Sequence, residues 1–230
     1  MSSARRKVLL SWSSGKDSAW SLHVLRQQPD IELVGLLTTV NVTHERVAMH
    51  AVRRDLLATQ AAAAGLPLQE IPIPIGCSNE QYDAAMASAL DRAKGAGIKA
   101  VAFGDLYLED IRKYREERLE GTGIEPLFPL WGEPTDALIQ TMIRGGLRAR
   151  ITCVDPRQMP EALCGSEIDA AFLAALPAGV DPCGENGEFH SFAFAGPMFD
   201  HEIDLRVGET VTRDGFVFTD LLPTAASNEA

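Results

Sequence analysis

The sequence predicts an α/β protein with a doubly wound parallel sheet, followed by a smaller α+β domain. Two observations predict this fold class. Short apolar runs, which suit strands buried on both faces, alternate with amphipathic segments of roughly ten to eighteen residues, which suit helices. Past Trp131 the alternation weakens, and short β runs with two further helices follow. We therefore divide the chain into residues 1–131 and residues 132–230.

The elements of the first half are predicted from periodicity and from stop signals. Pro72 and Pro74 indicate that the third strand lies near an edge of the sheet or leaves the sheet early. Ser78 and Gln81 form a capping box that begins a helix, and Gly65 ends the helix before it. Strands are expected over residues 8–10, 31–40, 68–75, 100–103 and 125–131, and helices after Gly15 and over 47–65, 79–95 and 108–119. In the second half we expect helices over 135–145 and 167–176, and β runs over 149–154, 189–194, 203–207 and 210–218.

Composition limits the classes of function. The chain has 230 residues, of which 46% are hydrophobic, and a net charge of −11. This acidic balance argues against a protein that grips a phosphate backbone, so no nucleic-acid partner is expected. The four cysteines lack any metal-ligand spacing, which indicates reduced thiols in a cytoplasmic protein. The apolar stretch after the basic N-terminus is about five residues, too short for a signal sequence or a membrane span, so no membrane partner is expected.

A polar turn between the first strand and the first helix carries the clearest chemistry. The apolar run 8–10 gives way to Ser13-Ser14-Gly15-Lys16-Asp17-Ser18, and helical periodicity follows. A helix N-terminus presents unpaired backbone N–H groups and partial positive charge, so such a turn can wrap an anion. Gly15 allows close approach of the backbone, and Lys16 adds a mobile charge. The turn therefore predicts a polyphosphate site.

The residue types at fixed positions of the turn indicate which kind of phosphate loop it is. A Walker A loop fails because Leu10 replaces the first glycine and Asp17 replaces the Ser/Thr that ligates Mg²⁺. A dinucleotide fingerprint fails because Gly121-Thr122-Gly123 does not follow a strand. The turn instead resembles the S-[SG]-G-x-D-S signature of the PP-loop ATP pyrophosphatases, which cleave ATP between the α and β phosphates. The alternative is a simple helix cap made by Ser14 with Asp17, which would not need three serines, a glycine and a lysine together.

Further candidate residues follow other strands of the predicted sheet. Ligands of doubly wound sheets collect at the carboxyl ends of the strands, where Thr38-Thr39, Gly104-Asp105 and residues 129–131 would lie beside the phosphate loop. We expect these features to line one pocket. Arg112 and Arg115 share one helix face and could steer an anionic substrate, although a solvated charged face is the alternative.

A second cluster of functional groups occupies residues 181–190. Two glycines, three acids, a cysteine and a histidine fall within ten residues, which is unusual for a plain connector. If a strand begins here, Glu188 and His190 face one way and Phe189 faces the other. An adjacent acid and imidazole suit proton transfer, Mg²⁺ ligation or binding of a cationic substrate. The alternative is a surface loop whose acids only solvate it.

Taken together, these motifs resemble the diphthine–ammonia ligase family. The resemblance rests on the PP-loop, on Gly104-Asp105 with residues 109–116, on residues 125–131, and on Gly184-Glu185-Asn186-Gly187-Glu188-Phe189-His190. It extends from Lys7 to about Leu222. His190, where many ligases have an acid, is more similar to a related bacterial branch, which leaves the identity of the acceptor open.

The resemblance implies an ATP-binding domain of the HUP type over 1–131, which is Rossmann-like, and a substrate-binding domain over 132–230. It implies ATP and Mg²⁺ as cofactors, and amidation of a carboxylate by ammonia through an adenylate. Residues expected to bind ATP are Ser13, Ser14, Gly15, Lys16, Asp17, Ser18, Thr38, Thr39, Gly104 and Asp105. Residues expected to act in catalysis are Lys16, Asp17 (also the Mg²⁺ ligand), Glu188 and His190, and those expected to bind substrate are Arg112, Arg115, Glu185, Gly187 and Glu188.

Two other classes of function stay open on the sequence alone. A nucleotide sensor would bind ATP or AMP and leave it intact. A PP-loop RNA-modifying enzyme would share the phosphate loop but would need a basic face. The source of the ammonia and the oligomeric state, a homodimer included, are not indicated by any motif.

Overall fold

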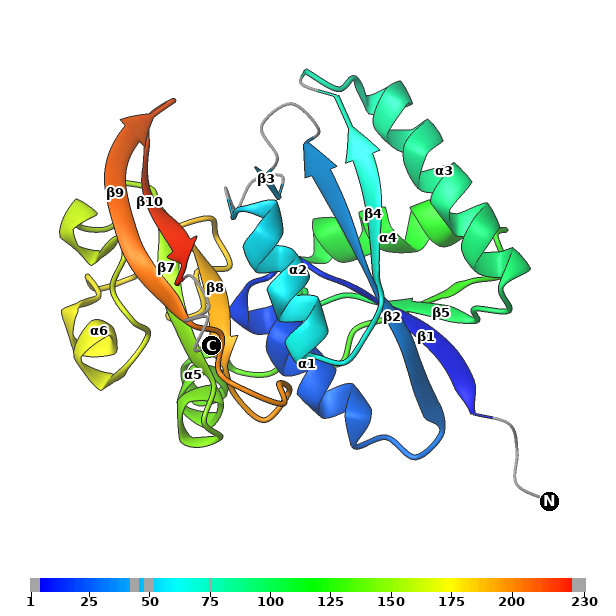
Figure 1. Cartoon of the computed structure of the whole chain (residues 1–230), viewed down its shortest axis with the longest axis horizontal. Helices are drawn as coiled ribbons and strands as arrows, with labels where there is room; N and C mark the ends of the chain where they lie inside the picture. The colour runs from blue at the N-terminus through cyan, green and yellow to red at the C-terminus, as the bar shows by residue number, and fades with distance from the viewer. Residues whose placement is uncertain (1–4, 42–45, 48–51, 75, 225–230) are drawn as a thin grey trace, which may run out of the picture.

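The computed structural model describes residues 5–41, 46–47, 52–74 and 76–224, which form two β-sheets with helices between and around them (Figure 1). The first sheet is the predicted doubly wound sheet. Its order is β3-β2-β1-β5-β6, and β4 pairs with the opposite edge of β2, because Leu36 and Leu37 of β2 pair with both β1 and β4. All pairs are parallel except β2 with β3. The strands are β1 (Arg6–Ser11), β2 (Ile31–Asn41), β3 (Arg46–Val47), β4 (Leu68–Ile73), β5 (Ala100–Ala102) and β6 (Glu125–Leu127).

Helices cover both faces of this sheet, as the fold class requires. On one face α1 (Lys16–Arg26) and α2 (Arg54–Ala63) bury leucines against Val8 and Leu10 of β1. On the other face α3 (Asn79–Gly95) and α4 (Glu109–Leu119) pack against Leu9 and Val101. Val8 and Leu10 belong to the apolar cluster on one face of the sheet, and Leu9 belongs to the cluster on the other face. Because both faces of β1 are buried, its sequence is an unbroken apolar run.

The second half forms an antiparallel sheet of order β8-β7-β10-β9. Helices α1 and α2 lie between the two sheets (Figure 1), and the apolar cluster on their side of the first sheet continues into Phe192 and Ala193 of β8. Its elements are α5 (Thr135–Arg144), β7 (Arg148–Val154), the 3-10 turn η1 (Glu161–Leu163), α6 (Ala170–Ala175), β8 (Phe189–Ala195), β9 (Leu205–Arg213) and β10 (Phe216–Pro223). No helix of the described residues is long and apolar enough to cross a membrane.

The sequence prediction of single elements succeeds in several places. Ser78 and Gln81 exchange both hydrogen bonds of the predicted capping box at the start of α3. The β4 strand pairs with β2 alone among the described strands, which confirms the edge position indicated by its prolines. Apart from β3 and η1, which were not predicted, the order and the type of the elements up to β8 are those that the sequence indicated.

Other boundaries were predicted wrongly. The helix expected over 47–65 begins at Arg54, because Arg46–Val47 pairs with β2; residues 48–51 lie outside the described part. The β runs expected over 203–207 and 210–218 are instead β9 and β10, joined at Asp214-Gly215. Both turn residues have positive φ, 53° and 80°, as a two-residue hairpin requires. The Asp-Gly dipeptide was the signal that the periodicity argument overlooked.

One buried side chain ties the two sheets together at the end of β1. Gln60 of α2 is fully buried. Its Oε1 accepts a hydrogen bond from Trp12 Nε1 at 2.7 Å, and its Nε2 donates to the carbonyl oxygens of Ser14 and Ala193 at 3.0 and 2.6 Å. Gln60 therefore holds the phosphate loop and strand β8 in one place.

Replacement of this amide should destabilise the protein. Gln60→Leu conserves the volume but leaves Trp12 Nε1 and the Ala193 carbonyl without this partner, so we expect a loss of about 2–4 kcal/mol in the free energy of unfolding. Urea unfolding measures this loss, with exposed Gln140→Leu on α5 as the control. A loss no larger than in the control would contradict the assigned role.

Candidate active site

The predicted phosphate loop connects β1 to α1 and is held in a strained conformation. Ser14 has a φ of 69°, which a residue with a side chain rarely adopts. Its carbonyl oxygen accepts hydrogen bonds from Ala193 N at 3.0 Å and from Gln60. Helix α1 has Gly15 as its N-cap residue and no side-chain cap. The alternative of a cap made by Ser14 with Asp17 is therefore wrong, and the loop has a different purpose.

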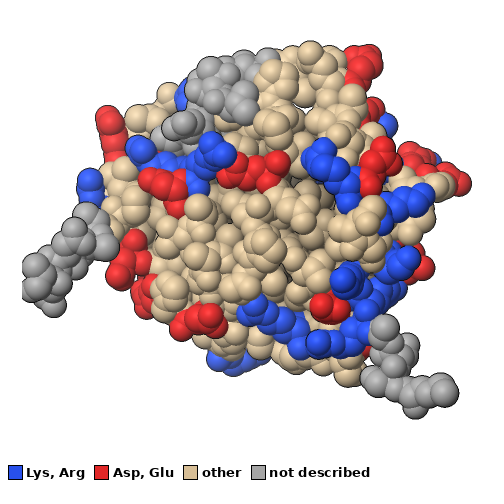
Figure 2. Space-filling view, turned by 45° about the vertical axis from the view of Figure 1, so that its right-hand side comes forward, with Lys and Arg blue, Asp and Glu red and all other residues tan. Residues whose placement is uncertain are grey.

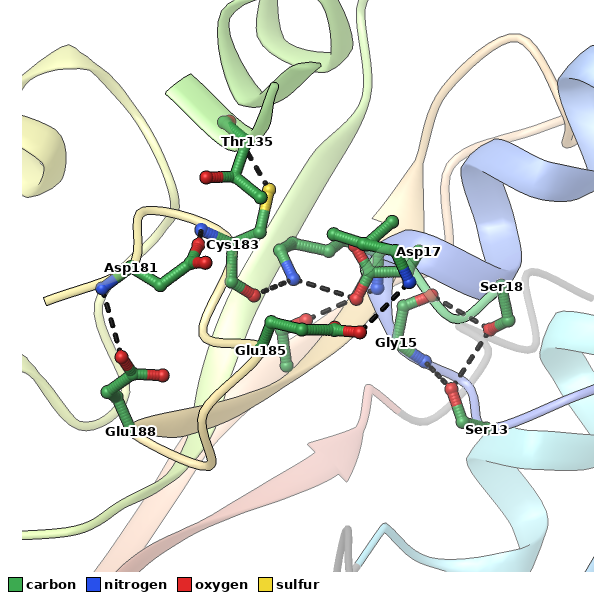
Figure 3. A network of polar contacts seen from close by, with 12 residues as sticks. Ser13, Gly15, Asp17, Ser18, Thr135, Asp181, Cys183, Glu185 and Glu188 are labelled. Carbon is green, nitrogen blue, oxygen red and sulfur yellow. Dashed lines mark hydrogen bonds and ion pairs between the residues drawn. The ribbon is translucent and has the colours of Figure 1, made fainter. Parts of the chain in front are cut away.

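The hydroxyl groups of the loop bond within it. Ser13 Oγ accepts a hydrogen bond from Gly15 N at 3.3 Å and lies 3.1 Å from Ser18 Oγ. Ser18 Oγ donates to the Gly15 carbonyl at 3.0 Å (Figure 3). These contacts shape the turn so that Ser13, Ser18 and the start of α1 border the same cavity. Ser14, which was predicted to bind ATP as well, is fully buried and lines neither cavity.

Lys16 is buried where the two halves of the chain meet. Its Nζ donates to Asp17 Oδ2 at 2.8 Å and to the carbonyl oxygen of Cys183, and it lies 5.4 Å from the centre of the Phe189 ring (Figure 3). Its backbone N–H donates to Ser191 Oγ at 3.2 Å. Burial acts against the charge, but the Asp17 carboxylate outweighs it and raises the pKa of Lys16. Lys16 is therefore a cation at neutral pH.

Asp17 has an oxygen that suits a metal ion. Oδ2 is paired with Lys16, whereas Oδ1 is buried and has no hydrogen-bond partner among the described residues. Those residues contain no group of three or more His, Cys, Asp or Glu side chains that could hold a metal ion. Mg²⁺ is commonly bound by one or two carboxylates together with phosphate oxygens. Asp17 Oδ1 therefore fits one ligand of a Mg²⁺ ion that arrives with a polyphosphate.

A cavity of about 260 Å³ opens beside the loop, between the two halves of the chain. It brings together most of the residues predicted for the site. Those among its lining are Ser13, Gly15, Lys16, Asp17, Ser18, Gly104, Asp105, Arg115, Glu185, Gly187 and His190. A Cβ on Gly104 would lie 3.1 Å from the backbone of Asp17 and Ser18, so only glycine lets this loop pack on the first turn of α1.

A second, larger cavity of about 510 Å³ adjoins the first. It lies at the carboxyl end of β2, where Thr38 and Thr39 line it together with largely apolar side chains of β4, α3 and α4. The expectation of one pocket is therefore wrong, because Thr38 and Thr39 line this cavity and not the one beside the loop. Residues 129–131 line neither cavity.

The loop over residues 181–188 is organised around Glu188. Both oxygens of the buried Glu188 carboxylate accept hydrogen bonds, from Asp181 N at 3.0 Å and from Asn186 N at 2.9 Å. The strand begins only at Phe189, so the expected alternation does not include Glu188. The prediction that Glu188 and His190 face the site side by side is therefore wrong: His190 lines the cavity, and Glu188 holds its own loop.

Glu185 is the acid of this loop that faces the cavity. Its Oε1 accepts a hydrogen bond from Leu106 N at 2.9 Å (Figure 3). The next residue, Tyr107, also contacts this loop, since its Oη lies 2.7 Å from Asp181 Oδ2. Burial raises the pKa of Glu185 to about 7, against the lowering effect of the Leu106 N–H. Glu185 therefore changes its charge near neutral pH, unlike an ordinary carboxylate.

The remaining predicted residues differ in their surroundings. Burial, with a smaller effect of the Lys16 charge, lowers the pKa of His190 to about 4, so its ring is neutral at pH 7. Arg115 lines both cavities, whereas Arg112 lines neither. Arg112 pairs with Glu116 at 2.8 Å and lies over Trp131, so it does not reach the site where substrate steering was expected.

Several contacts of the site have no signal in the sequence. Gln60, Ser191 and the carbonyl of Cys183 all bind the phosphate loop from distant parts of the chain. Ser191 follows the predicted motif by one residue and could have been included on that ground alone.

Comparison with known protein families gives two matches. The diphthamide synthase N-terminal domain matches residues 6–126, and the diphthamide synthase C-terminal domain matches residues 134–219. The chain belongs to the diphthamide synthase family. One relative in this family, the diphthine–ammonia ligase of Bos taurus, is 23% identical over an alignment of 188 residues, which covers 77% of this chain and 68% of the bovine protein. The family resemblance inferred from the motifs is confirmed.

The raised pKa of Glu185 should appear in the stability of the protein. Between the pH of the ordinary carboxylate pKa and about pH 7, the folded state binds more protons at Glu185 than the unfolded state does. The contribution of Glu185 to the free energy of unfolding therefore falls as the pH rises. The free energy of unfolding of Glu185→Gln, relative to that of the wild type, should therefore rise by roughly 1–3 kcal/mol between about pH 5 and pH 8.

Urea unfolding across this pH range measures the gain. Exposed Glu133→Gln serves as the control, because it leaves the cavity unchanged. A constant difference between Glu185→Gln and the wild type at every pH would show that Glu185 has an ordinary pKa.

Proposed function

We propose that the protein is an ATP-dependent ligase that adenylates a carboxylate, releases pyrophosphate and forms an amide with ammonia. The observation that carries this proposal is the cavity beside the phosphate loop, which is lined both by the buried cation Lys16 and by the titratable acid Glu185. Membership of the diphthamide synthase family supports it, and so does the name of the bovine relative.

Activation of the acid is required by the chemistry. A carboxylate does not exchange oxide or hydroxide for ammonia in water, because neither is a good leaving group. Attack of the carboxylate oxygen on the α-phosphorus breaks its bond to the bridging oxygen and releases pyrophosphate. Ammonia then attacks the acyl carbon, and AMP departs as the leaving group.

The two adjoining cavities suit the two ends of ATP. In our proposal the adenosine occupies the larger cavity beside Thr38 and Thr39, and the phosphates extend towards the start of α1. The amides at the helix N-terminus and the Lys16 ammonium would then receive the charge that develops on pyrophosphate. Residues 1–131 thus bind the nucleotide, and residues 132–230 close the site with the acceptor.

Asp17 Oδ1 would hold the Mg²⁺ ion, which supplies charge neutralisation at the phosphates. The Ser13 and Ser18 hydroxyl groups line the same side of the cavity and would bind phosphate oxygens. Catalysis by this half of the site would consist of positioning and stabilisation of charge.

Glu185 suits the removal of a proton from ammonium better than the residues chosen from the sequence. Ammonia is largely protonated at neutral pH, so a base must accept a proton before attack. The carboxylate of Glu188 is engaged with its own loop, and a pKa of about 4 makes His190 a weak base. Glu185 faces the cavity with a pKa of about 7, which is matched to this task. His190 and Gly187 would form the wall that the acceptor contacts.

Nucleic acid is not a partner in this proposal. Both kinds of charged side chain border a broad uncharged area on the face drawn in Figure 2, and the net charge is −11. The four cysteines of the protein form no disulfide, which supports the proposal of a cytoplasmic protein. The acceptor is diphthine or another carboxylate.

The products of ATP cleavage test the proposed reaction. With ATP, Mg²⁺, ammonium and a pool of carboxylic acids, the protein should release AMP and pyrophosphate. Lys16→Met should lower the rate by about 100-fold or more, because it removes a cation that stabilises the leaving group. The exposed Lys113→Met is the control. ADP with orthophosphate would contradict the proposal, and bound but intact ATP would favour a nucleotide sensor.

The role of Glu185 is tested by a change of nucleophile. Glu185→Gln should keep the exchange of pyrophosphate into ATP but lose amide formation with ammonium by about 100-fold. Hydroxylamine, which is largely unprotonated at neutral pH, should react with this variant at close to the wild-type rate. Equal losses with both nucleophiles would show that Glu185 does not accept the proton.

A further inference from the structure

The two cavities meet at a small set of shared residues. Ser11, Ser13, Phe103 and Arg115 line both of them. Arg115 is the one charged side chain in this set. A ligand that extends from the larger cavity to the phosphate loop must therefore pass the guanidinium group of Arg115.

The guanidinium group is positioned by an aromatic ring and by an acid. Its carbon lies 4.9 Å from the centre of the Phe103 ring, and its Nε lies 3.5 Å from Asp105 Oδ2. This separation is at the limit of a hydrogen bond, so the pair is weak and a better acceptor can displace it. Burial raises the pKa of Asp105, and Arg115 opposes that effect. When Arg115 leaves, the pKa of Asp105 rises further, so this carboxyl group can take up a proton and does not remain as an unpaired buried charge.

The two cations that line the smaller cavity, Lys16 and Arg115, differ in their partners and in their place. Lys16 already donates to Asp17 and to the Cys183 carbonyl, at the loop end of the cavity. Within the lining of that cavity Arg115 is the other cation, and unlike Lys16 it also lines the larger cavity, so it lies at the end where the two cavities meet. The phosphate that joins the two parts of a nucleotide would lie at this end.

We propose that Arg115 binds the α-phosphate of the nucleotide and exchanges its contact with Asp105 for the phosphate oxygens. This inference rests on the proposed function for the orientation of ATP. Arg115 then keeps the AMP part of the adenylate in place after pyrophosphate has left, because Lys16 lies at the end that pyrophosphate occupies. A guanidinium group suits this task, since its fork of N–H groups matches two phosphate oxygens.

The same helix supplies a matched control. Arg112 lies three residues earlier on α4, and its guanidinium is also stacked, 4.7 Å from the centre of the Trp131 ring. It pairs with Glu116 and lines neither cavity. The two arginines share a helix and a stacked geometry, but only Arg115 reaches the place where the cavities meet.

Calorimetric binding of AMP and of adenosine to the full chain tests the inference. Arg115→Met should weaken AMP binding by about 10- to 100-fold, the range expected for a charge-assisted contact, and change adenosine binding by less than about twofold. Arg115→Lys should recover part of the loss. Arg112→Met should leave both affinities unchanged. Unchanged AMP affinity in Arg115→Met, or equal losses for AMP and adenosine, would overturn the inference.

A kinetic measurement separates this inference from the proposed function. In the exchange of pyrophosphate into ATP, Arg115→Met should lower kcat more than it raises KM, because the α-phosphate gains charge in the transition state. If the wild type releases ADP and orthophosphate, the ligase proposal fails, whereas the difference between AMP and adenosine still tests Arg115. A rise in KM with unchanged kcat would contradict the role in the adenylate.

Discussion

The structure depends on the hydrogen bonds that fix the carbonyl oxygen of Ser14. This residue sits in a left-handed conformation, and such strain persists only where the surroundings hold it. Ala193 of β8 and Gln60 of α2 both donate to its carbonyl. The contact shapes the phosphate loop, and it also fastens the second sheet to the first. Phe189, His190 and Ser191 reach the loop because β8 is anchored there.

The carboxyl groups near this loop differ in their surroundings, and these differences determine what each can do. The carboxyl groups of one aspartate and two glutamates have three different environments. Asp17 is paired with a buried lysine and keeps one oxygen without a protein partner, Glu185 faces the cavity and titrates near neutral pH, and Glu188 is satisfied by backbone N–H groups. Asp17 and Glu185 line the cavity and differ in their hydrogen-bond partners, whereas Glu188 does not line it. These differences underlie the proposed roles of a metal ligand and a base, and they leave Glu188 as an acid that holds its own loop.

The sequence was sufficient for the parts of the fold that depend on local patterns. Apolar runs, the capping box at Ser78 and the prolines of β4 are read within a few residues, and they predict the sheet, a helix start and an edge strand correctly. The phosphate loop is equally local. The Asp214-Gly215 turn is also a local signal, but it was not used when residues 210–218 were predicted as one β run.

Features that depend on distant contacts could not be predicted in this way. The buried bonds of Gln60 join residues 46 and 133 positions away in the chain, and Arg112 and Arg115 look equivalent until the cavities are known. For the same reason Glu188, which the motif made prominent, was preferred to Glu185. A motif identifies which residues occur together, whereas the structure decides which of them face the ligand.

The central claim is that the loop at the start of α1 holds the two terminal phosphates of ATP, so that the bond next to the α-phosphate is cleaved. A crystal structure with an ATP analogue that has a methylene group between the α and β phosphates tests it most directly. We expect the β and γ phosphates against Ser13 to Ser18 and the adenosine beside Thr38 and Thr39. A triphosphate bound elsewhere, or one that enters the loop with its α-phosphate out of reach of an acceptor in the cavity, would contradict the account.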